Sequence, residues 1–263
     1  MADLNIFGVA QPTLSGITTI LNLLSCHPLA EASRQAIWFS AREEPMIYIN
    51  HTPFVLREAA NPLQNLKIYH GISAARLESM ESRLKEDVLR EIAKWNQLLL
   101  VHEELQDAKI IPTWTALDHV QTPREVFESF SAQGYAVKYV RIPISPEQAP
   151  EDHYLDEYVQ HIKNASLQDA LVFNCGMGGG RTTFAMVLAM ILRREQLLQS
   201  GNPDPLRLAV QEAPLHDWKN ESKTTLRLVY MLEQGVFSFF NIQVSQPKLP
   251  LDPPLTGHSR AGP

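Results

Sequence analysis

Cysteine is scarce in this 263-residue chain: it occurs twice, as Cys26 and Cys175, at widely separated positions. Two distant cysteines cannot form a disulfide framework, and neither stands at the Cys/His spacing of a zinc site. Disulfide-poor proteins are typical of reducing compartments, so we expect a cytoplasmic protein. We also expect it to need no metal and no cofactor.

The chain also lacks an excess of basic residues. It contains 23 Lys and Arg and 29 Asp and Glu, which gives a formal net charge of -6. Proteins that bind nucleic acid through its phosphates are usually basic, so the composition argues against a nucleic-acid partner. A small phosphorylated ligand remains compatible with this charge, since a local site can be positive on an acidic protein.

A hydrophobic run of membrane-spanning length is missing from the N-terminal region. The apolar stretch at residues 14–24 is too short to cross a bilayer, and Asp3 precedes it where a secretory signal would carry basic residues. We therefore predict a buried helix there and no transmembrane segment.

Hydrophobic residues make up 44% of the chain, which is enough for one substantial core. Short apolar runs predict strands at residues 37–39, 46–49, 54–56, 135–140 and 170–173. Three- and four-residue periodicity and capping signals predict helices at residues 77–99, 122–134, 155–162 and 182–199. We interpret Trp95, in the first of these helices, as a packing residue.

This alternation of strands and helices is typical of an α/β fold with a central, mostly parallel sheet flanked by helices. Right-handed crossovers would bring the loops that follow the strands to one edge of the sheet. The stretch 246–263 is rich in proline and glycine, so we predict one folded domain over 1–245 and a disordered tail over 246–263.

The segment that carries chemistry follows the apolar run 170–173. Cys175 is followed six positions later by Arg181, four glycines lie between them, and a helix begins directly afterwards. Such glycines let successive backbone N–H groups converge on an anion, and the free N–H groups of the helix point to the same place. Arg181 can hold two phosphate oxygens with its planar fork.

This arrangement favours nucleophilic attack on phosphorus. The positive environment would lower the pKa of Cys175, whose thiolate would form a cysteinyl-phosphate. The predicted phosphate-binding residues are those of the loop and the helix start: Gly176, Met177, Gly178, Gly179, Gly180 and Thr182. The Thr182 hydroxyl would donate to the thiolate.

Two other interpretations of the loop are weaker. A buried cysteine in a tight turn would need neither four glycines nor an arginine at this offset. A nucleotide-binding loop would end in Gly-Lys-Ser or Gly-Lys-Thr, whereas this one ends in Gly-Arg-Thr. We interpret Cys26 as a small core residue; a resolving thiol for Cys175 is the alternative.

The run Cys175–Thr183 resembles the CxxGxGRTT signature of protein-tyrosine-phosphatase-like enzymes, and the chain as a whole resembles the paladin and phytase-like (inositol hexakisphosphate) phosphatase family. Besides the loop, the stretches that carry this likeness are Ile6–Thr13, Trp38–Glu58 and Thr122–Ile144. The resemblance covers roughly residues 5–240. It implies a cysteine-phosphatase fold, and it implies one repeat of a family whose members carry several.

What the resemblance implies about function is a phosphorylated partner, either a small molecule or a phosphoprotein. The resemblance alone favours inositol phosphates and phosphoinositides over phosphotyrosine as the ligand. Sister repeats or a second copy of the chain are further implied partners.

The chain departs from the family pattern at two positions. Asn174 stands where active loops often carry histidine, and Pro146 stands where relatives carry the aspartate that protonates the leaving group. Glu147 is the candidate substitute for this general acid, and Asp152 is the alternative. Other candidates for contacts to a polyanion are Arg42, Arg57, Lys67, His153, His161 and Lys163.

The leading hypothesis is thus a cysteine-dependent phosphatase acting on phosphomonoesters through Cys175, Arg181 and Glu147. Its first rival is a pseudophosphatase that binds phosphorylated ligands with little turnover, because the aspartate is missing. The second rival is a structural repeat that needs sister repeats to fold or work.

Overall fold

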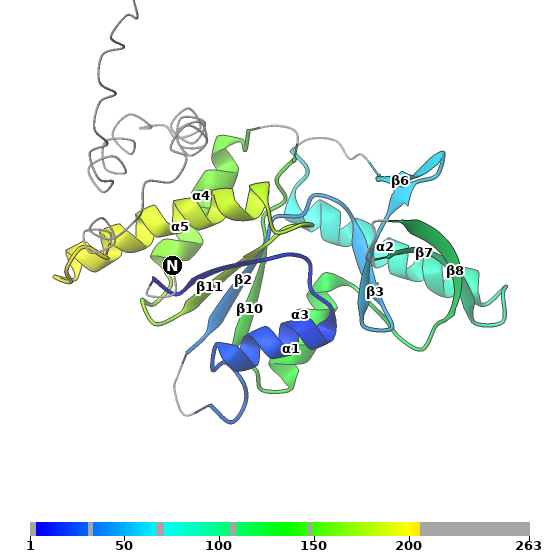
Figure 1. The fold of residues 1–263 in the computed structure, drawn as a ribbon, viewed down its shortest axis with the longest axis horizontal. Coiled ribbons are helices and arrows are strands. Elements are labelled where there is room, and N and C mark those ends of the chain that lie inside the picture. Colours follow the sequence, from blue (N-terminus) through cyan, green and yellow to red (C-terminus); the bar gives the residue numbers. More distant parts are fainter. Residues whose placement is uncertain (1–3, 31–33, 67–70, 106–108, 147–148, 206–263) are drawn as a thin grey trace, which may run out of the picture. The chain divides into compact units, whose positions relative to one another are not determined.

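Strands β2 and β11 lie side by side at the centre of the fold, and every one of their residues is buried. Figure 1 shows the computed structural model, which describes residues 4–30, 34–66, 71–105, 109–146 and 149–205. The described elements belong to one compact unit that ends at Pro203. The predicted boundary at residue 245 and the predicted tail 246–263 lie outside the described residues.

The central sheet is parallel throughout, with strand order β1-β11-β2-β10. Its strands are β1 (Ile6–Val9), β11 (Ala170–Asn174), β2 (Ala36–Ser40) and β10 (Val137–Arg141). In the register Phe173 lies opposite Phe39, and Asn174 lies opposite Ser40. The carboxyl ends of β11, β2 and β10 therefore meet at one edge, as the sequence predicts.

Helices cover both faces of this sheet (Figure 1). They are α1 (Leu14–Leu23) and α3 (Pro123–Ala132) on one face, and α4 (Asp152–Lys163) and α5 (Gly180–Gln199) on the other. Alternate residues of β2 serve the two sides: Trp38 packs with Phe127 of α3, whereas Phe39 packs with Tyr158 of α4. The predicted α/β fold with a parallel sheet flanked by helices is confirmed.

The N-terminal apolar run forms α1, which buries Ile17 and Leu21 and leaves Leu23 79% exposed. It is an amphipathic helix on the surface of the sheet. Within the described ranges, no helix is both long and apolar enough to cross a membrane.

The capping signals at Thr122 act as expected. The Thr122 hydroxyl accepts from the backbone N–H of Glu125 at 3.2 Å, and the Glu125 carboxylate accepts from the N–H of Thr122 at 2.8 Å. The helix ends before Gly134, whose φ of +89° suits glycine.

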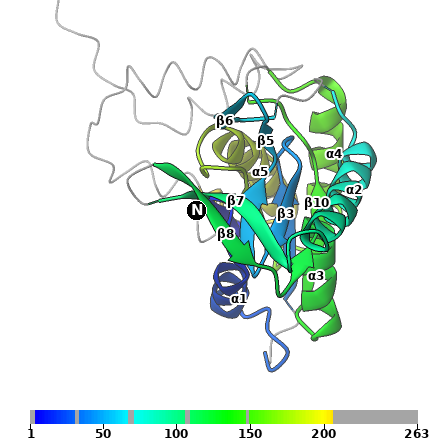
Figure 2. The same ribbon diagram turned by 90° about the vertical axis from the view of Figure 1, so that its right-hand side faces the viewer.

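A second group of elements lies beside the sheet and is seen face-on in Figure 2. It contains the long helix α2 and several antiparallel strands. These elements are β3 (Met46–Ile49), β4 (Thr52–Val55), β5 (Arg57–Glu58), β6 (Asn61–Asn65), α2 (Ala74–Ile92), β7 (Leu98–Glu104), β8 (Ile110–Ala116) and β9 (Val120–Gln121).

The prediction that one helix continues to Leu99 is wrong, because α2 ends at Ile92. Asn96 and Gln97 adopt φ values of 50° and 64°, which break the helix and turn the chain into β7. The leucines after the turn continue a three- to four-residue spacing but belong to a strand. Trp95 lies in the turn, 53% exposed, with its ring 6.0 Å from that of Trp114.

Candidate active site

The loop from Cys175 to Arg181 connects the end of β11 to the first turn of α5. It packs closely against the chain that leaves β1: a Cβ on Gly178 would lie 2.8 Å from the backbone nitrogen of Ala10, and the φ of Gly178 is +72°. Neither the space nor the backbone angle suits another residue. Glycine at this position therefore lets the loop close over the end of β1.

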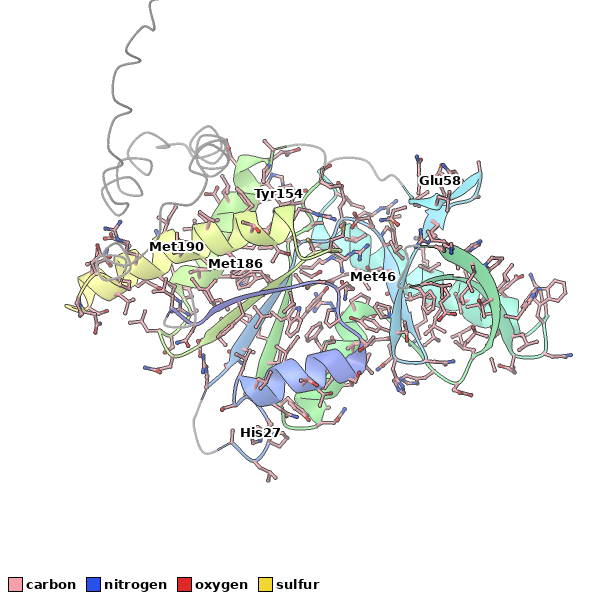
Figure 3. The ribbon with its side chains drawn as sticks, in the orientation of Figure 1. His27, Met46, Glu58, Tyr154, Met186 and Met190 are labelled. Atoms are coloured by element: carbon pink, nitrogen blue, oxygen red, sulfur yellow. The ribbon has the colours of Figure 1, made fainter. Side chains whose placement is uncertain are left out.

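Further back, α5 also approaches β1 closely. A Cβ on Gly8 would collide with the sulfur of Met186, one of the two α5 residues labelled in Figure 3. Because Arg181 lies in the first turn of α5, this packing helps to set where the loop meets the helix.

Cys175 lies at the base of the loop and is only 4% exposed. Burial by itself raises the pKa of the thiol, but donation from the hydroxyl and N–H of Thr182, the charge of Arg181 and the N–H of Gly178 outweigh it. The pKa of Cys175 therefore lies below its ordinary value. The buried Thr182 hydroxyl has no oxygen or nitrogen partner among the described residues, so its proton is available to the sulfur.

Arg181 is held by a bidentate ion pair with Glu44. Its two terminal nitrogens lie 2.9 and 3.2 Å from the two carboxylate oxygens, and one of them also donates to the carbonyls of Ala41 at 3.3 Å and Ile144 at 3.1 Å. Both side chains are about nine-tenths buried, with exposures of 12% and 11%. The guanidinium thus has a fixed orientation beside the loop.

Arg42 is a second cation at this place. Its Nε donates to Glu44 at 3.3 Å, and its Nη1 would lie 3.5 Å from a Cβ on Gly176. Burial lowers the pKa of Arg42 despite the neighbouring Glu44. For the carboxylate of Glu44, burial acts in the opposite direction and raises the pKa. The charges and hydrogen bonds of Arg42 and Arg181 outweigh burial and hold the pKa of Glu44 below its ordinary value.

Arg141, at the end of β10, binds the backbone of the segment that carries Arg42 and Glu44. Arg141 donates to the carbonyls of Arg42 at 2.8 Å and Glu44 at 3.3 Å, and it pairs with Glu81 of α2 at 3.1 Å. The side chains of this pair are 0% and 1% exposed. A buried ion pair between the sheet and α2 thereby helps to position Arg42 and Glu44 beside the loop.

We identified Arg42 from the sequence as a candidate contact to a polyanion but did not predict its position in the site. We did not predict Glu44, Arg141 or Glu81 as site residues. The signal for Arg42 and Glu44 was present in the sequence. Charged residues that directly follow a buried strand such as β2 would be unusual without a partner. Asn174, in the position of the family histidine, accepts from the Trp38 indole N–H at 2.8 Å and donates to Gln11 at 2.9 Å.

The predicted general acid Glu147 lies outside the described residues. Of its neighbours, Pro146 is exposed, and the alternative acid Asp152 is an exposed residue in the first turn of α4. Met177, predicted to bind phosphate, is 94% exposed on the loop, and Gly179 and Gly180 are also exposed.

Two of the remaining cation candidates contact residues outside the loop. His153 lies 3.4 Å from Glu151 and packs on the Tyr154 ring, whereas His161 packs edge-on against Phe39. Lys163 is exposed near the end of α4, Arg57 lies in β5, and Lys67 is outside the described residues.

Cys26 is a core residue and is 1% exposed. Burial raises the pKa of its thiol. Its carbonyl accepts from Ala136, which precedes β10, whereas Cys175 follows the parallel strand β11. The two thiols therefore lie at opposite ends of strands about 16 Å long, so the interpretation of Cys26 as a resolving thiol is wrong.

Comparison with known proteins agrees with this geometry. Residues 39–193, more than half of the chain, match the PTP-like phytase family, whose description reads "Inositol hexakisphosphate". Paladin of Gallus gallus is 29% identical over 237 residues, which cover 88% of this chain and 25% of paladin. The chain thus spans about a quarter of the length of this curated relative.

Two solved structures show the same fold. The PTP-like myo-inositol phosphatase from Mitsuokella multacida, in complex with myo-inositol-(1,3,4,5)-tetrakisphosphate, superposes with a TM-score of 0.56 at 18% identity, over 92% of this chain and 38% of the other. A PTP-like phytase from Bdellovibrio bacteriovorus gives 0.50 at 18% identity, over 94% and 83%.

Proposed function

Because the chain belongs to the PTP-like phytase family, we propose that it is a cysteine-dependent phosphatase that hydrolyses phosphomonoesters at Cys175. The observation that carries this proposal is a thiol of lowered pKa at the base of a glycine loop that ends in a clamped arginine. Phosphate release from an activated aryl phosphate and from inositol hexakisphosphate by the purified protein is the direct test.

In the proposed reaction, the Cys175 thiolate attacks phosphorus, so that an S–P bond forms as the P–O bond of the ester breaks. The loop N–H groups and Arg181 bind the non-bridging oxygens, whose charge they stabilise in the transition state. A general acid, for which Glu147 is the candidate, protonates the leaving oxygen. Water then attacks phosphorus, the S–P bond breaks, and inorganic phosphate and the thiolate are released.

The substrate class we favour is an inositol phosphate or phosphoinositide. The structural neighbour from Mitsuokella multacida is a complex with such a ligand. In this chain Arg42 adds a second guanidinium next to Gly176, beside the clamped Arg181. Two adjacent guanidinium groups suit a ligand with more than one phosphate better than an isolated phosphotyrosine.

A pseudophosphatase that binds the same ligands without turnover is the second candidate. The observation in its favour concerns the residues after Ile144, whose carbonyl accepts from Arg181. These residues, Ser145 and Pro146, provide no carboxylate. Without an acid, the leaving group must depart as an anion. Alkyl phosphates such as inositol phosphates would then stay intact, whereas activated aryl phosphates would still be cleaved.

The variant Glu147→Gln separates these two functions. If Glu147 is the acid, we expect turnover of inositol hexakisphosphate to fall roughly a hundredfold, because the alkoxide must then leave unprotonated. Turnover of an activated aryl phosphate is expected to change less than about twofold. The measurement is kcat for both substrates at the same pH.

Asp152→Asn is the matched control, since it removes a nearby carboxylate of the same charge. It should leave both rates unchanged. A selective loss in Asp152→Asn instead would transfer the acid role to Asp152. No loss on either substrate in Glu147→Gln would remove Glu147 from the mechanism.

We also propose that the chain works beside sister repeats or a second copy of itself. The curated relative is about four times longer than the part that this chain matches. Sedimentation equilibrium of the purified chain tests the second copy, and a monomer that unfolds cooperatively on its own would argue against both.

A further inference from the structure

Gln11 lies on the segment between β1 and α1, and it bonds to the residues on both sides of Cys175. Its backbone N–H donates to the carbonyl of Gly176 at 2.9 Å, and its side-chain oxygen accepts from the amide of Asn174 at 2.9 Å. The segment approaches the loop so closely that Gly178 has no room for a Cβ. One residue thus holds the loop just before and just after the nucleophile.

The side-chain bonds form a chain with a single direction. The indole of Trp38 can only donate, so the oxygen of Asn174 accepts from it, and the Asn174 NH₂ must face Gln11. The Gln11 NH₂ then donates to the Tyr48 hydroxyl at 2.7 Å, and this hydroxyl donates to the carbonyl of Pro12 at 3.1 Å. Because both ends are fixed, neither amide can flip without losing two hydrogen bonds.

The backbone bond determines where the loop amides point. The Gly176 carbonyl is directed at Gln11, and in a planar trans peptide the next N–H, that of Met177, points the opposite way. A loop that binds an anion needs its carbonyls turned outward and its N–H groups inward. The bond from Gln11 supports this arrangement directly after Cys175.

We propose that Gln11 is a positioning residue that holds the phosphate loop in its anion-binding conformation, partly through Asn174, which stands where active loops often carry histidine. It does not contact the reacting atoms and acts through Asn174 and Gly176. The proposal rests on the proposed function only in that Cys175 is the nucleophile.

The test is the pH dependence of Cys175 alkylation by iodoacetamide in Gln11→Met, a change of nearly equal volume. The variant removes the side-chain bond to Asn174 and keeps the backbone bond to Gly176, so loosening of the loop should move the Cys175 pKa toward that of a free thiol. We expect alkylation near pH 6 to slow about three- to tenfold, with no change near pH 10, where each protein is thiolate. The site of alkylation is read by mass spectrometry of the Cys175 peptide.

Tyr48→Phe is the matched control, since it removes the far end of the hydrogen-bond chain and leaves the Asn174–Gln11 bond in place. We expect its alkylation profile to match that of the unchanged protein within about twofold. If Gln11→Met does not fold, Trp38→Phe replaces it, because losing the indole donor frees the Asn174 amide.

An unshifted profile in Gln11→Met, or an equal shift in Tyr48→Phe, would overturn the proposal. A merely structural effect would lower the melting temperature without moving the thiol pKa. Alkylation needs no turnover, so a chain that proves to be a pseudophosphatase leaves this test intact.

Discussion

Replacing Cys175 with serine is expected to lower phosphate release from an activated aryl phosphate by roughly 1,000-fold or more. The thiolate is the attacking group in the proposed reaction, whereas a serine hydroxyl is protonated at neutral pH and is a weak nucleophile without a base. Binding should survive, since the loop N–H groups and Arg181 remain. The measurement is initial-rate phosphate release, with ligand-induced thermal stabilisation by inositol hexakisphosphate alongside.

Cys26→Ser is the control for this experiment, because the second thiol lies in the core at the far end of the sheet. Equal release by the Cys175→Ser and unchanged proteins would show that another group attacks phosphorus. No release by either, with stabilisation retained in both, would favour the pseudophosphatase.

The lowered pKa of Cys175 also sets the direction of the pH dependence. The reactive form is the anion, so it persists to lower pH than for a free thiol and is lost as pH falls through the lowered pKa. The acid limb of kcat/KM for an activated aryl phosphate should therefore lie below the range of an ordinary cysteine.

The sequence was informative wherever the structure depends on neighbouring residues. The strand, the glycines, Arg181 and the following helix are contiguous, and the capping box at Thr122 spans four residues. The helix prediction failed at Ile92 because hydrophobic spacing alone does not register the turn at Asn96 and Gln97.

The partners of the site depend on distant contacts, which no local pattern contains. Glu44 and Arg181 are 137 residues apart, and Gln11 and Asn174 are 163 apart. In the sequence, Glu44 looks like an ordinary surface charge. Only the folded sheet brings the loop, and with it Arg181, next to this carboxylate. Sequence could indicate that a nucleophile and a clamp were present, but not what holds them in place.

The variant Glu81→Met is expected to reduce the free energy of unfolding by about 3–5 kcal/mol, because it leaves the buried Arg141 without its counter-charge. The backbone N–H of Met46, which donates to the same carboxylate at 3.2 Å, loses its acceptor as well. The measurement is urea unfolding of the two proteins, with comparison of their midpoints and slopes.

Glu78→Met on the same helix is the matched control, since Glu78 pairs at 2.6 Å with Arg124, whose side chain is 48% exposed. Water can solvate Arg124 after the change, so its cost should stay within about 1 kcal/mol. Pairing Glu81→Met with Arg141→Met removes both buried charges and should recover part of the loss. If Glu81→Met cost no more than Glu78→Met, Arg141 would not depend on Glu81.

The same variants connect stability to the site. Arg141 holds the carbonyls of Arg42 and Glu44, and Glu44 in turn orients Arg181. Glu81→Met should therefore weaken stabilisation by inositol hexakisphosphate even at temperatures where the variant is fully folded, whereas Glu78→Met should not. Equal ligand stabilisation in both folded variants would mean that the loop keeps its cations in place without support from α2.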